Sequence, residues 1–199
     1  ILTDPDIVYD LHSGQNLISF PFPGSISISE GLPDHVEGEF TGLIGEGVAT
    51  SQIALQTWVG SLTLWSGTKG YWAKVNSDLT FIFNEPTLNR LEEEISDLNE
   101  YPFIQSTQQA FYFIDDIGTL DIEMGDIVLI YNEDVLVGSR SYNGLYTDIP
   151  AMGYMDEATS GYLNSGDVPT FKLVKSNGDV INIEAYAEPW MQNELFMIS

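Results

Sequence analysis

Carboxylates are the side chains of this sequence with the widest capacity for chemistry. The 199-residue chain carries 30 Asp and Glu against 6 Lys and Arg, a formal charge of −24. Loop carboxylates are ligands that Ca²⁺ prefers, and the ion takes about 6–8 oxygens. No EF-hand spacing is present, so solvated loop acids remain the alternative to a calcium site, and the sequence requires no cofactor. The candidate calcium ligands lie between apolar runs of the second half: Asp115, Asp116, Asp121, Asp126 and Asp134.

The excess of acid limits the partners of the protein. A strongly negative chain repels phosphate backbones and anionic lipid heads, so we expect no nucleic acid partner. No apolar run approaches the roughly 20 residues that a membrane span needs, so membrane insertion is not expected either. Two interpretations of the acidity stay open: a solvating shell suited to a salty medium, and carboxylate clusters that bind divalent cations.

Catalytic chemistry finds little support in the residue types. The chain has no cysteine, and its two histidines, His12 and His35, are isolated from any nucleophile motif. Paired carboxylates can hydrolyse glycosides. Among 30 acidic residues, however, two will always lie near one another, so the presence of such a pair is not specific for catalysis. We expect a protein that is not an enzyme, and a glycoside-active enzyme ranks third among the functions considered.

Aromatic side chains offer a second kind of binding chemistry. Their flat apolar faces can stack on sugar rings, although aromatics at strand spacing more often fill a core. Along Tyr71-Trp72, one ring must point inward and the other outward. The candidate ligand-binding residues fall into one group in each half of the chain: Trp58, Trp65 and Trp72, and separately Tyr142 and Tyr146.

Arg140 is an isolated cation in an acidic region. Its planar guanidinium suits a bidentate carboxylate partner, and Asp126 and Asp148 are the candidates. Such an ion pair would hold a loop to a sheet. A role in clamping a substrate is the alternative.

Two hairpins are the elements that must position these residues. The apolar runs 127–131 and 135–137 predict two strands folded around a turn at residues 132–134. Runs 169–175 and 180–185 predict a second pair, because the intervening Asn177-Gly178 is a strong hairpin signal. The longer loop at 142–166 is the expected contact surface of this half.

Short β-rich runs on both sides of one helical pattern define the expected domain organisation. The apolar residues of that pattern recur at helical spacing between residues 88 and 98. We therefore expect an N-terminal β module at residues 1–86, a short helix or linker at 87–101 and a C-terminal β module at 102–199. The predicted fold is all-β, with two packed antiparallel β-sandwich-like modules and at most one or two short helices.

Sequence motifs in both halves resemble modules of bacterial and viral surface proteins. The first set is residues 14–21 (GQNLISFP), 58–62 (WVGSL) and 69–72 (KGYW), which is similar to the "GWNLISFP…GSL…KGYW" modules of secreted bacterial surface proteins. Gln15 stands where that pattern prefers Trp. The second set is similar to a companion module of marine bacterial surface proteins and marine phage structural proteins: residues 109–113 (QAFYF), 125–126 (GD), 137–140 (VGSR), 150–153 (PAMG) and 161–162 (GY).

This resemblance implies location and partners but no catalytic residue. It implies an extracellular protein of the cell surface or the virion that assembles with neighbouring structural proteins or with copies of itself. We therefore expect a non-catalytic structural or adhesive module, with calcium stabilisation as an open question. A carbohydrate-binding module that uses exposed aromatics on a surface glycan is the alternative.

Overall fold

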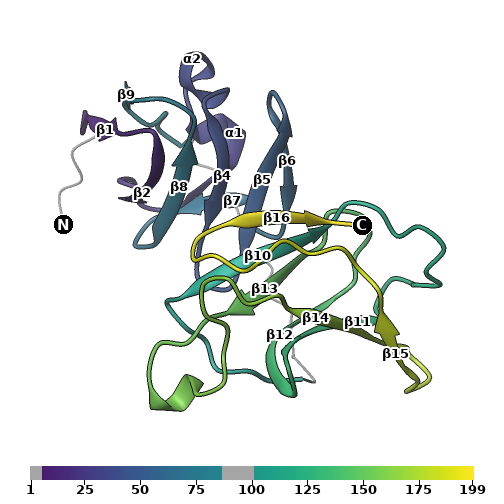
Figure 1. Cartoon of the computed structure of the whole chain (residues 1–199). Coiled ribbons are helices and arrows are strands. Elements are labelled where there is room, and N and C mark those ends of the chain that lie inside the picture. The colour runs from purple at the N-terminus through teal and green to yellow at the C-terminus, as the bar shows by residue number, and fades with distance from the viewer. Residues whose placement is uncertain (1–5, 87–100) are drawn as a thin grey trace. The chain divides into compact units, whose positions relative to one another are not determined.

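The computed structural model of the protein describes residues 6–86 and 101–199 (Figure 1). The chain divides into two compact units, Ile1–Ile95 and Ser96–Ser199, and the division falls within the connector expected at residues 87–101. The helical pattern at residues 88–98 lies outside the described residues. The fold is all-β, as the sequence predicts, and its helices α1 (Ile28–Gly31) and α2 (Asp34–Glu37) are each about one turn long.

The first unit is built on an antiparallel five-stranded sheet. Its strand order is β2-β8-β4-β5-β6, and two small ladders, β1-β9 and β3-β7, accompany it. The strands are β1 (Tyr9–Leu11), β2 (Gly14–Ser19), β3 (Ser25–Ser27), β4 (Phe40–Ile44), β5 (Ala49–Ala54), β6 (Thr57–Gly60), β7 (Leu64–Ser66), β8 (Gly70–Val75) and β9 (Leu79–Phe81).

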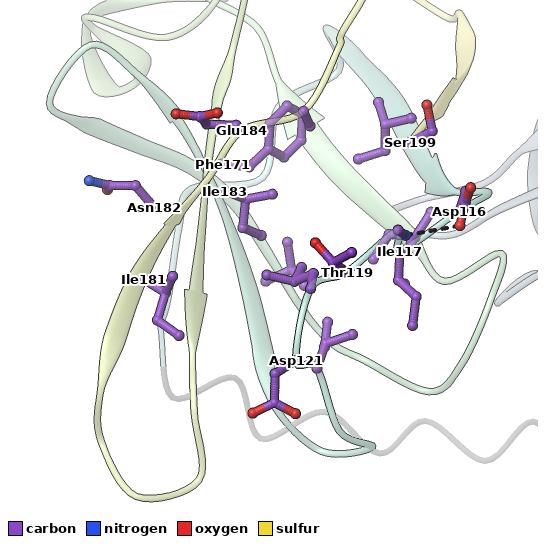
Figure 2. Close-up of a pocket in the computed structure, with 17 residues that line it drawn as sticks. Asp116, Ile117, Thr119, Asp121, Phe171, Ile181, Asn182, Ile183, Glu184 and Ser199 are labelled. Atoms are coloured by element: carbon purple, nitrogen blue, oxygen red, sulfur yellow. Dashed lines mark hydrogen bonds between the residues drawn. The ribbon is translucent and has the colours of Figure 1, made fainter.

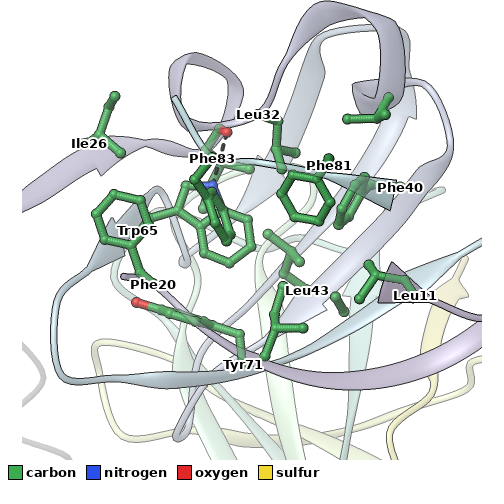
Figure 3. Packing of buried hydrophobic residues seen from close by; sticks show 14 of the residues in the cluster. Leu11, Phe20, Ile26, Leu32, Phe40, Leu43, Trp65, Tyr71, Phe81 and Phe83 are labelled. Atoms are coloured by element: carbon green, nitrogen blue, oxygen red, sulfur yellow. Dashed lines mark hydrogen bonds between the residues drawn. The ribbon is translucent and has the colours of Figure 1, made fainter. Parts of the chain in front are cut away.

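Aromatic side chains fill the core of this unit. Burial alternates along β8 because successive side chains of a strand point to opposite faces, so Tyr71 is buried and Trp72 is half-buried. Figure 3 shows Trp65 at the centre of a group of rings, and its centroid lies 4.9 Å from those of Tyr71 and Phe83 in edge-on geometry. Such pairs stabilise a core beyond the burial of their area.

The second unit is a sandwich of two sheets around one core. One sheet has the order β13-β10-β16 and the other β12-β11-β14-β15. Tyr112 and Ile149 of the first sheet and Val128 and Leu173 of the second belong to the same buried cluster. The strands are β10 (Gln109–Ile114), β11 (Ile127–Asn132), β12 (Val135–Ser141), β13 (Asp148–Met152), β14 (Thr170–Val174), β15 (Val180–Ile183) and β16 (Leu195–Ile198), and a 3₁₀ turn, η1, covers Glu157–Thr159.

The strand pairing of this unit departs from the prediction in one respect. The chain was expected to be antiparallel throughout, but β16 runs parallel to β10. A parallel neighbour requires a long connection rather than a hairpin, and β16 is separated from β10 by all the other strands of the unit. Strand β16 lies at one end of its sheet, and β15 lies at one end of the other.

Both predicted hairpins are present. β11 and β12 pair around the turn Glu133-Asp134, where Glu133 adopts a left-handed conformation with φ of 52°. β14 and β15 pair around Asn177-Gly178, and Gly178 has φ of 90°. A side chain at that φ is strained, which explains why glycine occupies the turn.

Candidate functional site

A groove of about 530 Å³ opens in the second unit between the loop after β10 and the edge strand β15 (Figure 2). Its floor is formed by core residues of both sheets, including Ile114, Val128 and Phe171. Ile117 and Leu120 of the loop pack partly buried against the same core. The groove is therefore the place where the sandwich core is left open to solvent. Strand β15 and the residue after it contribute four residues to the lining: Ile181, Asn182, Ile183 and Glu184.

Strand β15 carries apolar side chains that are unusually exposed for such positions. Ile181 and Ile183 are cross-strand partners of Leu173 and Phe171, which are core residues, so both isoleucines face the core side of the sheet. Ile181 nevertheless remains 39% exposed, because β15 is the last strand of its sheet. On the opposite face, Val180 is 60% exposed.

The hydrogen-bond pattern of the hairpin shows which backbone groups of β15 are available. The N–H of Lys175 donates to the carbonyl of Asp179 at 2.9 Å. In an antiparallel ladder, hydrogen-bonded and non-hydrogen-bonded pairs alternate, so Ile181 and Ile183 bond to β14 while the N–H and C=O of Asn182 point away from it. No described strand pairs with this outer edge.

A buried ion pair fixes one wall of the groove to the hairpin. The carboxylate of Asp126 is 1% exposed and accepts hydrogen bonds from the N–H of Glu123 at 2.9 Å and of Ser176 at 3.1 Å. The Nζ of Lys175 lies 2.9 Å from the same carboxylate and donates to the carbonyl of Asp121 at 2.8 Å. The ammonium group thus ties the loop before β11 to the end of β14.

Opposing effects set the protonation of this pair. Burial acts to raise the pKa of Asp126, but the hydrogen bonds from Glu123, Lys175 and Ser176 outweigh it and hold that pKa below its ordinary value. The hydrogen bond to Asp126 raises the pKa of Lys175, although burial partly opposes it, and the nearby carboxylate of Asp121 adds to the rise. Both groups therefore stay charged over the whole neutral range.

Side chains of the core hold the segment that follows β15. The hydroxyl of Tyr112 donates to the carbonyl of Glu188 at 2.9 Å, and the indole N–H of Trp190 donates to the carbonyl of Ala151 at 3.0 Å. Burial raises the pKa of Tyr112 well above its ordinary value, and Glu188 adds to this, so the hydroxyl remains a donor. The segment between β15 and β16 is thus anchored to the core.

The rim of the groove is acidic. Asp116, Asp121 and Glu184 lie along it, and among the described lining residues none is Lys, Arg or His. Asp116 accepts a hydrogen bond from the N–H of Gly118 at 2.9 Å, which shapes the loop. In Figure 2, Asp121 lies toward one end of the row formed by Ile181 and Ile183, and Glu184 lies toward the other.

The predicted calcium ligands do not come together. Within residues 6–86 and 101–199, no three His, Asp or Glu side chains lie close enough to hold a metal ion. Asp134 is exposed in the turn of the β11–β12 hairpin, whereas Asp126 lies at the opposite end of β11. A six-residue strand is about 20 Å long, so these two residues cannot share an ion. The positive charge beside Asp126 and Asp121 is the ammonium of Lys175.

Arg140 binds one of its two predicted partners. Its Nη2 lies 3.5 Å from the Oδ2 of Asp148, and its Nε donates to the carbonyl of the same residue at 2.9 Å. Asp148 is 2% exposed. The contact joins β12 to β13 and thereby links the two sheets. Asp126, the other predicted partner, forms its ion pair with Lys175.

Each of the two predicted groups of aromatic ligand residues contains a buried member. Trp65 is 0% exposed, and its indole N–H donates to the carbonyl of Ile28 at 3.1 Å. The prediction that it binds a ligand is therefore wrong, and Trp65 is a core residue. Tyr142 is 6% exposed and belongs to the core of the second unit, so the prediction that it binds a ligand is wrong as well. The remaining three, Trp58, Trp72 and Tyr146, are half-buried.

Trp58 has a structural partner that the sequence does not reveal. Its indole N–H donates to the Oε1 of Glu37 at 2.8 Å. Glu37 is fully buried, and its Oε2 has no hydrogen-bond partner among the described residues. The indole of Trp58 therefore supplies the hydrogen bond that offsets the cost of burying the Glu37 carboxylate.

Sequence reasoning also missed the groove and the role of Lys175. Ile181 and Ile183 were assigned to a strand, but their exposure depends on which strand ends the sheet. Lys175 is the last residue of the predicted strand 169–175, and no local signal places it near Asp126, because the pairing of β11 with β14 brings the two residues together. The pairing itself joins residues far apart in the chain.

Fold and site together define an all-β protein with two sandwich-like units, one of which has an apolar groove along a strand edge that no described strand pairs with. Comparison of the chain with protein-family models, with curated proteins and with solved structures finds no match. Within the described part of the chain, no helix has the length and apolar character to cross a membrane.

Proposed function

We propose that this chain is a non-catalytic structural or adhesive module of an extracellular surface or virion assembly, in which it binds neighbouring proteins. The observation that carries the proposal is the apolar groove along the free edge of β15. Exposed aliphatic side chains beside an unpaired strand favour burial against another chain. The setting rests on the resemblance of residues 14–21 and 69–72 to surface-protein modules, and on an acidity suited to a salty medium.

The composition of the groove favours binding over catalysis. A glycosidase needs two carboxyl groups that face the same bond of a bound sugar. The walls here are aliphatic, and the acids lie at the rim, where Asp116 is engaged in the turn of its own loop. A sugar site would also be expected to present exposed aromatic faces, whereas Trp65 and Tyr142 are buried.

Labelling of intact source cells or particles tests the proposal. An antibody raised against the folded chain should label them without permeabilisation, and the protein should stay with the surface or particle fraction through a wash. Recovery of the protein only from the cell interior would overturn the proposal. A glycan array hit abolished by Trp72→Ala would instead favour the carbohydrate-binding alternative, and hydrolysis of glycosides by the purified chain would favour the enzyme.

A further inference from the structure

We infer that the edge of β15 accepts an added β-strand from another protein, a segment with apolar side chains at alternate positions and basic residues at its ends. This inference rests on the proposed function for its biological setting and names the partner chemistry of the same groove. Strand addition is a common way for a sheet to bind an extended peptide, because main-chain hydrogen bonds supply affinity and alternate side chains supply specificity.

The backbone of β15 meets the first requirement. The N–H and C=O of Asn182 point away from β14, as the register of the hairpin shows. An incoming strand can bond to these groups without displacing any bond within the sheet. At about 3.3 Å per residue, the four residues of β15 span about 13 Å, so the central part of a nine-residue strand can pair with β15 while its ends extend past it.

The groove meets the second requirement. Side chains of an added strand lie directly beside those of the strand that it joins. Those on the core side would therefore lie next to Ile181 and Ile183 and enter the groove of about 530 Å³ toward Ile117 and Leu120. This volume accommodates several aliphatic side chains, and their insertion would complete the open side of the core.

The charge of the rim selects the partner. Asp121 and Glu184 lie toward opposite ends of the isoleucine row, and no basic side chain is among the described lining residues. The Nζ of Lys175 lies 3.6 Å from Asp121, but it also pairs with Asp126, so two carboxylates face one ammonium group and the charge at that end stays negative. Basic residues at both ends of the incoming strand would meet these acids. A second copy of this chain is disfavoured, because each copy carries a formal charge of −24 and the two would repel one another.

The probe for this inference is the synthetic peptide KTVTVTVTK-amide, with a fluorophore in place of an N-terminal acetyl group so that both lysine side chains keep their charge. Its anisotropy is measured against the purified full chain. We expect saturable binding, and about tenfold weaker binding or more for the peptide with glutamate in place of both lysines. A version N-methylated at alternate residues, which cannot donate along one edge, should also bind about tenfold weaker.

Two variants of the protein locate the binding. Asn182→Pro removes the outward N–H of β15 while leaving the bonds to β14 in place, a change that edge strands tolerate. Ile181→Ser removes an aliphatic side chain from the groove without altering the charge. Each should weaken binding about tenfold. Val168→Ser, at a residue 57% exposed and outside the groove, is the matched control and should bind as the parent does.

Distinct results overturn the inference. The inference fails if Ile181→Ser binds the probe as tightly as the parent protein does and the parent binds the N-methylated peptide as tightly as the probe. Those results would show that the negative charge alone attracts the probe. Self-association of the chain that Asn182→Pro abolishes would assign the edge to a second copy. Because Ile181→Ser and the N-methylated peptide do not depend on the proline, a folding defect in Asn182→Pro leaves the test intact. Surface labelling tests the location of the protein separately from these measurements, so a failure of strand addition and a failure of the proposed surface location are distinguishable.

Discussion

Removal of the Asp126 carboxylate should destabilise the second unit more than removal of any other acid of the groove loop. In Asp126→Ala, the N–H groups of Glu123 and Ser176 lose their acceptor. An unsatisfied backbone donor costs about 1–3 kcal/mol, and both groups are only partly buried, so about 1 kcal/mol each and about 2 kcal/mol in total is expected. For a unit of this size, that loss lowers Tm by about 8 °C or more.

Thermal unfolding followed by circular dichroism measures this loss, with Asp121→Asn as the matched control. The side chain of Asp121 is 89% exposed and lies 3.6 Å from the same Lys175 Nζ. An exposed ion pair contributes about 0–1 kcal/mol, so the control should melt within a few degrees of the parent. Equal melting of both variants and the parent would refute the role assigned to the buried carboxylate.

The pH dependence gives a second measure of the same pair. Because the pKa of Asp126 is lowered in the folded protein, its contribution to stability is present above the unfolded value, near pH 4, and disappears as the pH falls through the folded pKa. The pKa of Lys175 is raised, so its contribution is present below about pH 10 and is lost as the pH rises through the folded pKa. The difference in stability between the parent and Asp126→Ala should therefore be constant near neutrality and shrink in acid. A difference that grows below pH 4 would contradict this assignment.

Three further changes test other parts of the structure. Trp58→Phe removes the donor to the buried Glu37 and should cost about 2 kcal/mol in a denaturant titration, whereas Trp72→Phe should cost clearly less; equal losses would count against the bond. Gly138→Ala should prevent stable folding of the second unit, because a Cβ there would overlap the carbonyl oxygen of Pro150; a native circular dichroism spectrum and an unchanged Tm would refute that close approach. Salt should raise Tm, since it screens the repulsion within a chain of formal charge −24, and a flat response from low to high salt would contradict this.

Much of the local structure follows from the sequence because short-range signals specify it. The apolar runs at 127–131 and 135–137 predicted one hairpin of the second unit, and the Asn177-Gly178 turn predicted the other. The sequence also predicts at most one or two short helices, and α1 and α2 are each about one turn long, with Pro33 between them. These features depend on backbone preferences within a few residues, so they can be read from the chain alone.

The candidate site could not be read in this way. Trp65 and Trp72 have the same side chain and lie on strands that are consecutive in the chain, but only packing decides that Trp65 enters the core. Asp126 lies among many loop acids, and its low pKa depends on Lys175, a residue brought to it by the pairing of β11 with β14. The acidic composition suggested that Asp126 binds a metal ion, whereas in the fold its partner is the ammonium group of Lys175.

The sequence by itself determined the all-β class, the two hairpins and the negative charge, because strand alternation, turn residues and titratable groups are properties of the residues and their immediate neighbours. The tertiary structure alone decided that β15 ends its sheet, that the core of the second unit opens beside it, and that Ile181 stays exposed. The order of strands in a sheet depends on pairings between distant segments. The groove, which carries the proposed binding of an added strand, is a consequence of that order.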